Sequence, residues 1–222
     1  MDLSRRSTDS ELLDEGVPEQ EALESLADLR RVNRWLGTHR RLLKAVRPFL
    51  ESSPQPRLLD VGCGSADIPD RIRRAVRRPL LAVGVDIKLL HLRAAPVEVR
   101  RVVADVQSLP FSSGAFDVVL ASHFLHHFDG AEVAAVLRRL YDLARRALIV
   151  DDIRRARVPY LFARSLFPFL LRSRVSHADG VLSIRRAFTV EELAAAFAEA
   201  GIPVRIQRAF PYRLLAVAQK AA

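Results

Sequence analysis

The segment from Leu58 to Pro69 constrains the fold of this chain more than any other part of the sequence. It reads LLDVGCGSADIP: an apolar strand runs into a turn that contains Gly62 and Gly64, and the turn opens a helix. A strand, a glycine turn and a helix in this order are typical of an open α/β sheet. Such a turn lets a ligand lie directly on the backbone at the carboxyl end of a parallel strand.

The residues around this turn indicate which ligand it takes. A dinucleotide site needs the spacing Gly-x-Gly-x-x-Gly, and its pyrophosphate lies against the helix N-terminus. Here the third position is Asp67, whose carboxylate would repel a phosphate at that place. A cationic or zwitterionic nucleoside fits better. S-adenosylmethionine is such a molecule, because it carries a sulfonium, an amino group and a carboxylate but no phosphate.

Three further apolar segments follow in the order expected of strands. Leu80–Asp86 ends in an acid, Val99–Ala104 is followed by Asp105, and Ala115–Ala121 leads into Ser122–Phe128. An acid at the end of the second strand can accept both hydroxyls of a ribose, and one at the end of the third can accept from the amino group of adenine. The two acids can also be a helix N-cap and a turn former, and the sequence leaves both readings open.

The chain resembles the class I S-adenosylmethionine-dependent methyltransferases, and among them the broad group that acts on small molecules. The resemblance covers about residues 55–219 and rests on four segments, DVGCGSADIP, VGVDIK, VVADVQSLPF and FDVVLASHFLHHF. It implies an α/β fold with a doubly wound seven-stranded sheet of order 3-2-1-4-5-7-6, in which the last strand is antiparallel, and an N-terminal helical extension. It also implies S-adenosylmethionine as the cofactor and S-adenosylhomocysteine as the product.

The resemblance also implies which residues bind the cofactor. The methionine part would face Asp60, Gly62 and Gly64, and Asp86 with Ile87 would bind the ribose. Asp105 with Val106 would bind the adenine. Ser122 and His127 would line the side of the sulfonium. The family often has a third glycine where this chain has Ala66, which is a departure of a single methyl group.

The composition and the charge limit the classes of protein to which this chain can belong. With a single cysteine, Cys63, no intrachain disulfide can form, and the sequence shows neither a signal peptide nor a run of about 18 apolar residues. We therefore expect a cytoplasmic protein. The net charge is +9, but the basic residues are mostly arginines scattered along the chain, which does not single out a nucleic-acid surface. The same charge would suit an acidic substrate or peripheral contact with a membrane.

The chain divides into an N-terminal helical extension, residues 1–53, and a methyltransferase-like domain, residues 54–222. Residues 1–17 are polar and are expected to be poorly ordered. Apolar residues at helical spacing predict two helices over residues 18–51, separated at Gly37. In related enzymes such helices cover the cofactor and shape the substrate pocket, so Trp35 is a candidate for substrate binding. A helical pair that simply packs on the core is the competing interpretation.

A segment dense in aromatic residues and leucines, Val158–Leu171, lies between the fifth strand and the next helix. We interpret it as part of a hydrophobic lid over about residues 153–188, with Phe162 against an apolar substrate. A dimer face and a helix that touches a membrane are the competing interpretations. The chain is accordingly expected to be a monomer or a homodimer.

The fifth strand ends in two acids, Asp151 and Asp152, at the edge where substrate contacts lie in open α/β sheets. They can hold a substrate hydroxyl, and Asp152 is the candidate for this role. They can also pair with Arg154 and Arg155. No third ligand at convincing spacing accompanies them, so we predict no metal site.

Transfer of a methyl group from a sulfonium is a displacement, and alignment of the nucleophile supplies much of its rate. A hydroxyl nucleophile also loses a proton, and histidine suits this step because its pKa lies near neutrality. His127 adjoins the predicted cofactor residues, and His177 lies on the substrate loop with Asp179, which could orient it. His127 and His177 are the candidate bases, and His123 and Asp179 are candidates for substrate binding.

The segment that follows the fourth strand, Ser122–Leu125, lacks the Asn/Asp-Pro-Pro-Tyr/Phe pattern often found in methylases of nucleobase or glutamine amino groups. This argues against a nucleic-acid partner. We predict O-methylation of a small, hydroxylated, partly apolar molecule such as a phenol, a polyketide or a quinone precursor. C-methylation of an activated ring carbon and an RNA-modifying enzyme remain the alternatives.

Overall fold

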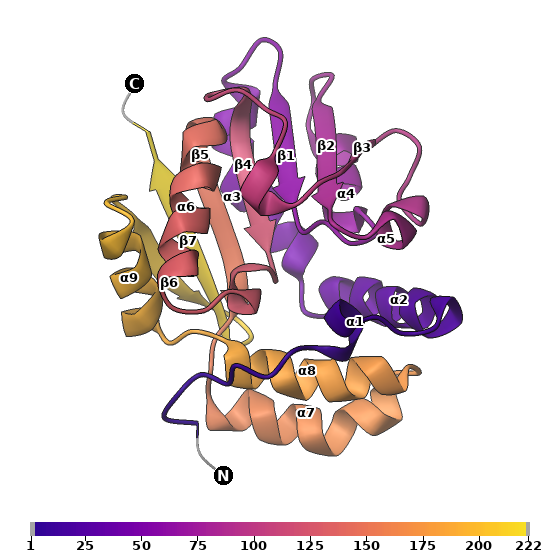
Figure 1. Cartoon of the computed structure of the whole chain (residues 1–222). Helices are drawn as coiled ribbons and strands as arrows, with labels where there is room; N and C mark the ends of the chain where they lie inside the picture. Colours follow the sequence, from indigo (N-terminus) through magenta and orange to yellow (C-terminus); the bar gives the residue numbers. More distant parts are fainter. Residues whose placement is uncertain (1–2, 221–222) are drawn as a thin grey trace.

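The computed structural model describes residues 3–220, and its central feature is a seven-stranded sheet with helices on both faces (Figure 1). In chain order the elements are α1 (Leu12–Glu15), α2 (Glu19–Trp35), α3 (Thr38–Glu51), β1 (Arg57–Val61), α4 (Asp67–Ala75), β2 (Leu81–Asp86), α5 (Leu89–Arg93), β3 (Arg100–Val103), η1 (Val106–Ser108), β4 (Phe116–Ser122), η2 (Leu125–His127), α6 (Ala131–Leu143), β5 (Ala144–Ile153), α7 (Arg157–Leu170), α8 (Arg174–Arg186), α9 (Val190–Glu199), β6 (Arg205–Ala209) and β7 (Arg213–Gln219).

The strands lie in the order β3-β2-β1-β4-β5-β7-β6, which confirms the predicted topology. β1 is parallel to both of its neighbours, with Leu59 opposite Val83 of β2 and Val119 of β4. β7 is antiparallel to β5 and to β6. The strand order reverses between β1 and β4, and ligands of open α/β sheets bind in the crevice outside the carboxyl ends of such strands.

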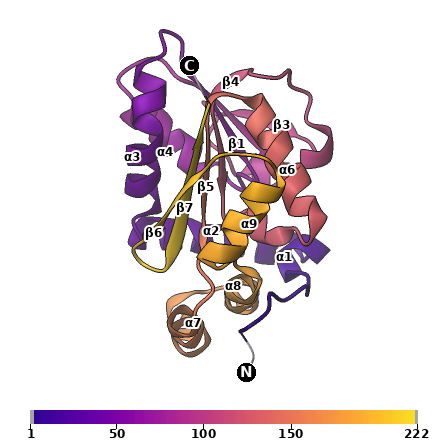
Figure 2. The same ribbon diagram turned by 90° about the vertical axis from the view of Figure 1, so that its left-hand side faces the viewer.

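Alternate residues of the central strands face opposite sides of the sheet, and both sides are buried. Leu58 and Val118 pack with helices α3 and α4, whereas Leu59 and Val119 pack with α6 and α9. Figure 2 shows these two pairs of helices on opposite faces of the sheet. Because neither face meets water, the strands are continuous apolar runs in the sequence, and this made them easy to predict.

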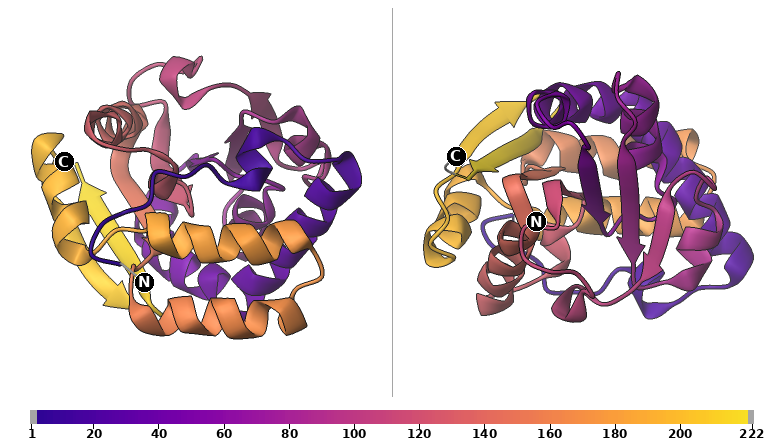
Figure 3. Two further views of the ribbon diagram at one scale, coloured as in Figure 1. Left: turned by 60° about the horizontal axis from the view of Figure 1, so that its bottom comes forward. Right: turned by 90° about the horizontal axis from the view of Figure 1, so that it is seen from above.

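Helices α1, α2, α7 and α8 form a further layer at the carboxyl edge of the sheet (Figures 1 and 3). α7 and α8 make a helical hairpin in which α8 lies against α1 and α2, while α7 lies on the outside. Gly180 of α8 permits the close approach of the two helices, since a Cβ atom there would lie 2.6 Å from the ring of Phe167. The lid predicted over residues 153–188 is therefore largely this hairpin.

The N-terminal segment, predicted to be poorly ordered, instead runs along α8 as a strap (residues 3–16) that ends in α1. A nitrogen of the Arg6 guanidinium lies 2.8 Å from the carbonyl oxygen of Phe128, to which it donates. The backbone N–H of Leu12 donates to Asp179 at 2.8 Å. The prediction was wrong because a segment poor in apolar residues can still be held by hydrogen bonds to otherwise unpaired polar groups.

Helix α6 ends at Leu143, and β5 begins directly after it at Ala144. Arg145 and Arg146 belong to the strand because both pair with Asp117, which is fully buried on the neighbouring strand β4. The two predicted N-terminal helices are α2 and α3, and they are separated at Gly37 as expected.

Candidate functional site

The glycine turn lies between β1 and α4, at the carboxyl edge of the sheet. Gly62 and Gly64 have φ angles of 68° and 53°, in the left-handed region that glycine adopts without a steric penalty. Ala66 also adopts a φ of 54°, which costs an alanine about 1 kcal/mol. Its methyl group is buried against Ala95 and Val99. The turn therefore reaches the predicted conformation even though an alanine replaces the third glycine.

Asp86, the last residue of β2, holds the glycine turn in place by hydrogen bonds. One of its oxygens accepts from the N–H of Gly64 and the other from the N–H of Lys88, each at 2.9 Å. Cys63 packs over Gly84, where a Cβ atom would lie 2.7 Å from the cysteine sulfur. The Asp86 carboxylate lines the cavity described next, and its remaining lone pairs can still accept from a ligand.

A cavity of about 550 Å³ opens beside the turn, a size common for small-molecule sites. Most of the residues assigned to the cofactor line it, together with one predicted substrate residue: Gly62, Gly64, Asp86, Ile87, Asp105, Val106, His127 and His123. The apolar part of the cavity wall consists of Leu26 and Leu29 of α2 together with Phe124 and Phe128. The strap adds two acids to the wall, Glu11 and Asp14. The structure thus brings the predicted cofactor residues together around one space.

Asp60 and Ser122, which were also assigned to the cofactor, are buried and do not belong to the cavity lining. Asp60 Oδ2 and Ser122 Oγ have no hydrogen-bond partner within residues 3–220. Burial, and then the negative charges of Asp67 and Asp86, raise the pKa of Asp60 well above its ordinary value. An unpartnered carboxyl group under the turn favours a cationic ligand group over a phosphate.

His126 is held between two carboxylates. Its Nδ1 lies 2.7 Å from Oδ1 of Asp152, and its Nε2 lies 3.5 Å from Oε1 of Glu11. Burial lowers the pKa of His126, but attraction to Asp152 and hydrogen bonds to both acids outweigh this and raise the pKa to about 10. Asp152 is not among the residues that line the cavity, and its carboxylate is hydrogen-bonded to His126, so the structure does not bring it to the predicted substrate side.

The His126 imidazolium leads us to expect a loss of stability in alkali. Its folded-state pKa of about 10 exceeds the value of about 6.5 for an unfolded histidine. The stabilisation is therefore fully present below about pH 6.5 and is lost as the pH rises through about 10. Between pH 7 and pH 10, the free energy of unfolding in urea should fall by about 3 to 4 kcal/mol more in the wild-type chain than in His126→Gln. Equal falls in the two chains would show that His126 is neutral in the fold.

His127 faces the cavity with its ring orientation set by the strap. Its Nδ1 lies 2.7 Å from Oδ2 of Asp14, and its ring stacks on that of His126 with the centroids 4.4 Å apart. A neutral histidine that donates from Nδ1 to a carboxylate presents the lone pair of Nε2 to its surroundings. The Asp14–His127 pair therefore has the arrangement of a general base and its orienting acid.

His123 has a different role, because its Nδ1 lies 3.2 Å from the guanidinium of Arg213. A guanidinium can only donate, so Nδ1 is the acceptor and the ring hydrogen is on Nε2. Burial, and then the charge of Arg213, lower the pKa of His123 well below its ordinary value. Its Nε2 is buried without a partner in the described part of the chain, so His123 is a neutral donor available to a ligand.

The structure does not pair His177 with Asp179 as a base and its orienting acid. Both lie in α8, and side chains two residues apart on a helix do not face each other. Nε2 of His177 lies 2.9 Å from the carbonyl oxygen of Leu171, whereas Asp179 accepts from backbone N–H groups of the strap. His177, Asp179, Trp35 and Phe162 are not among the residues that line the cavity.

Asp151 pairs with residues that the sequence does not bring near it. One oxygen lies 2.7 Å from Nε of Arg41 in α3, and the other lies 2.8 Å from the guanidinium of Arg213 in β7. The predicted pairing with Arg154 and Arg155 is wrong. Arg155 pairs with Glu192 instead, and it does so because the chain turns away from the sheet after β5.

Two cavity residues, Glu11 and Asp14, were missed by the sequence reasoning. Both belong to the strap. Glu11 is 7% exposed, and the side chain of Asp14 is half exposed. Glu11 accepts a hydrogen bond from the hydroxyl of Ser183 at 2.6 Å. No periodicity or motif surrounds these acids in the sequence, so nothing distinguished them from the other acids of the N-terminal segment.

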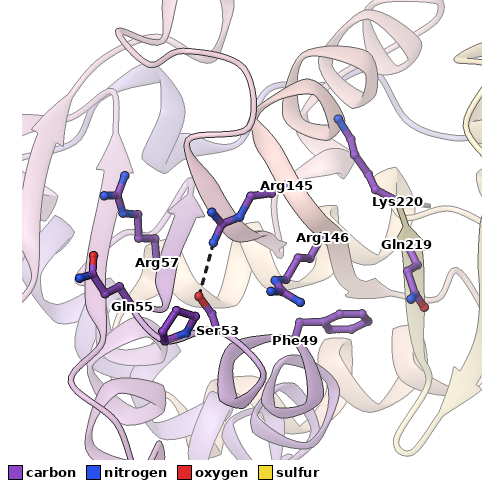
Figure 4. Close-up of a pocket in the computed structure, with 9 residues that line it drawn as sticks. Phe49, Ser53, Gln55, Arg57, Arg145, Arg146, Gln219 and Lys220 are labelled. Carbon is purple, nitrogen blue, oxygen red and sulfur yellow. Dashed lines mark hydrogen bonds between the residues drawn. The ribbon is translucent and has the colours of Figure 1, made fainter. Parts of the chain in front are cut away.

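A second hollow, of about 740 Å³, lies at the opposite edge of the sheet (Figure 4). It is lined by Arg57 at the start of β1, by Arg145 and Arg146 at the start of β5 and by Lys220 after β7. Part of this positive charge is offset by the ion pairs with Asp117. Because ligands of open α/β sheets bind at the carboxyl ends of the strands, we place the functional site at the glycine turn.

Comparison with known families supports this placement. Residues 59–147 match the family described as "Methyltransferase domain", and this stretch holds the glycine turn, Asp86 and Asp105. The sheet around it has the order of the class I enzymes. Residues 59–147 therefore carry a methyltransferase domain, and the chain has the class I methyltransferase fold. S-adenosylmethionine is the cofactor of that class. The cavity of this methyltransferase suits it, because the glycine turn lines the cavity and the unpartnered carboxyl group of Asp60 is buried under that turn.

Three known proteins show how far the similarity extends. The methyltransferase is 29% identical over 91 residues, 40% of its chain, to "Arginine-hydroxylase NDUFAF5, mitochondrial" of Danio rerio, and the match spans 28% of that protein. The plantazolicin methyltransferase BpumL, solved with a triazolic desmethylPZN analog and SAH, matches with a TM-score of 0.68 at 11% identity, covering 91% of this chain and 98% of BpumL. The CurJ carbon methyltransferase matches with a TM-score of 0.62 at 17% identity, covering 83% and 54%. At such identities the two structures establish the fold alone.

Proposed function

We propose that this methyltransferase transfers a methyl group from S-adenosylmethionine to a hydroxyl of a small, partly apolar substrate of the phenol, polyketide or quinone type. The observation that carries the proposal is the Asp14–His127 pair in the wall of the cavity that holds the glycine turn. A hydroxyl acceptor needs a nearby proton acceptor, and an oriented neutral histidine supplies one.

The cofactor side of the cavity is built from the three strand ends. When bound, S-adenosylmethionine supplies a methyl group on a positively charged sulfur. Gly62 and Gly64 would leave room for its methionine part, and Asp86 with Ile87 would hold the ribose. One oxygen of Asp105 already accepts from the N–H of Gln107 at 2.8 Å. The other oxygen would accept from the adenine amino group, with Val106 beside it.

On the acceptor side, His127 would take the proton that the substrate hydroxyl loses. Asp14 would stabilise the imidazolium that forms, as a carboxylate does in other oriented histidine bases. His123 would donate from Nε2 to an oxygen of the substrate. His126 cannot be the base, because it already carries its proton between Asp152 and Glu11.

The apolar part of the cavity supports a partly apolar substrate. Leu26 and Leu29 come from α2, and Phe124 and Phe128 flank η2. The extension over residues 1–53 would therefore act as a cap on the domain of residues 54–222, through α2 and the strap. In this proposal the hairpin within residues 153–188 supports the cap from behind and does not touch the substrate.

The proposal is tested by incubating the protein with S-adenosylmethionine and a panel of phenols and hydroxyquinones. We expect release of S-adenosylhomocysteine and an O-methylated product, both identified by mass spectrometry. His127→Asn should lower kcat by about 100-fold or more, because it removes a general base, and should change the Kd of S-adenosylhomocysteine far less than it changes kcat. Asp9→Asn is the matched control, since Asp9 is an exposed acid of the strap that pairs with Arg185 and does not line the cavity.

Each other outcome points to a different acceptor. Full turnover in His127→Asn would contradict the proposed base. A product methylated on a ring carbon would favour C-methylation, in which His127 need not take a hydroxyl proton. Methylation of RNA, with binding that weakens steeply as salt is raised, would replace the small-molecule proposal altogether.

A further inference from the structure

The outer face of helix α7 is apolar and exposed. Val158, Leu161, Phe162, Leu166 and Phe169 follow one another at the spacing i, i+3, i+4, i+8 and i+11, which places them on one side of a helix. Their exposed fractions run from 41% for Leu166 to 84% for Phe169. We call these five residues the α7 outer face. A contiguous apolar stripe of this kind on a protein surface marks a contact site.

The fold does not need this face for its own packing. The opposite side of α7 already supplies Tyr160 and Ala163, which are buried together with Ile184 of α8. Phe167 approaches Gly180 of α8 on the same inner side. Figure 3 shows α7 as the outermost helix of its layer. Apart from the edge-to-face contact of Phe162 with Phe167, the α7 outer face is therefore left exposed after the hairpin has packed.

The charge around the α7 outer face is of one sign. Between Asp152 and Asp179 the sequence has no acidic residue but has six arginines, at positions 154, 155, 157, 164, 172 and 174. Arg155 is buried and paired with Glu192, so it does not contribute to the surface charge. Arg157 and Arg164 are exposed on α7 and, at seven residues apart, lie on the same flank of the apolar stripe. Long arginine side chains at the edge of an apolar face can reach anionic groups while the stripe is buried.

We propose that the α7 outer face docks on a membrane that contains negatively charged lipids. An apolar face flanked by arginines is the arrangement of helices that lie in the plane of a bilayer surface. α7 has 14 residues, whereas a span needs about 20, and none of the helices in residues 3–220 is long and apolar enough to cross a bilayer. Pairing with a second copy would bring arginines against arginines, with no acid of this stretch to offset them.

The test uses the full chain and vesicles of two compositions, phosphatidylcholine alone and phosphatidylcholine mixed with phosphatidylglycerol. We expect the protein to sediment with the mixed vesicles and to be released by high salt, as electrostatic attachment is screened. Phe162→Asp combined with Phe169→Asp should reduce the bound fraction about 10-fold or more, and Arg157→Glu combined with Arg164→Glu should do the same. Val97→Asp is the matched control, because Val97 is 79% exposed outside the hairpin.

All four substituted positions on α7 are exposed, so the variants should keep the fold, and circular dichroism checks this. Failure of the wild-type chain to bind the mixed vesicles overturns the proposal. Binding that survives both double variants overturns it as well, since another surface would then be responsible. If the wild-type chain sediments as a dimer and the phenylalanine variant as a monomer, a second copy covers the α7 outer face and the proposal is wrong.

Discussion

Gly62→Ala is expected to weaken cofactor binding strongly, whereas Gly114→Ala is expected to leave it intact. The two glycines have nearly the same backbone conformation, with φ angles of 68° and 65°, so each alanine carries the same left-handed penalty of about 1 to 2 kcal/mol. Their surroundings differ. A Cβ atom on Gly62 would lie 2.1 Å from the ring of Phe124, whereas one on Gly114 would have no atom within 4 Å among the described residues.

Titration calorimetry with S-adenosylhomocysteine separates the two effects. For Gly62→Ala, Phe124 must move within the cavity that both residues line, and we expect the Kd to rise by about 100-fold or more, equivalent to about 2.7 kcal/mol. For Gly114→Ala the Kd should stay at the wild-type value while the melting temperature falls. Equal losses of affinity in the two variants would mean that backbone strain, and not the cavity wall, governs binding.

Asp151→Ala is expected to cost about 3 to 5 kcal/mol of unfolding free energy, because it leaves the buried arginines of an ion-paired group without their shared partner. Asp151 is fully buried, and the side chains of Arg41 and Arg213 are 11% and 3% exposed. The three residues join α3, β5 and β7. The loss of unfolding free energy should therefore appear as a shift of a single cooperative unfolding transition to a lower urea concentration.

The matched control for Asp151→Ala is Glu51→Ala. Glu51 also pairs with an arginine, Arg47, but the two side chains are 35% and 47% exposed, and exposed pairs of this kind contribute about 0 to 1 kcal/mol. A cost of less than about 1 kcal/mol for Asp151→Ala would show that water reaches the two arginines once the acid is removed.

The parts of this protein that the sequence predicts well are those governed by local chemistry. The strands around Leu59 and Val119 are buried on both sides, so they appear as unbroken apolar runs. The glycine turn is readable because Gly62 and Gly64 must adopt conformations that few other residues adopt. Asp86 and Asp105 were found because strand ends in an open sheet meet at one edge.

The parts that the sequence predicts poorly depend on contacts between distant residues. The strap was expected to be poorly ordered, because the hydrogen bonds that hold Arg6 and Glu11 leave no pattern in the sequence. His177 was grouped with Asp179 by proximity along the chain, but the helical conformation of α8 separates their side chains. Phe162 was assigned to the substrate because an apolar segment has the same sequence pattern whether it lines a pocket or faces outward.

The strap has a consequence for the order in which the protein is completed during synthesis. Asp14 and His127 are 113 positions apart in the chain, and Glu11 and Ser183 are 172 positions apart. Because the N-terminal end of a chain leaves the ribosome first, the strap cannot form all of these contacts until the hairpin of α7 and α8, which contains Ser183, has emerged. A nascent chain therefore carries the glycine turn long before Ser183, the last residue of the cavity wall along the chain, has been synthesised.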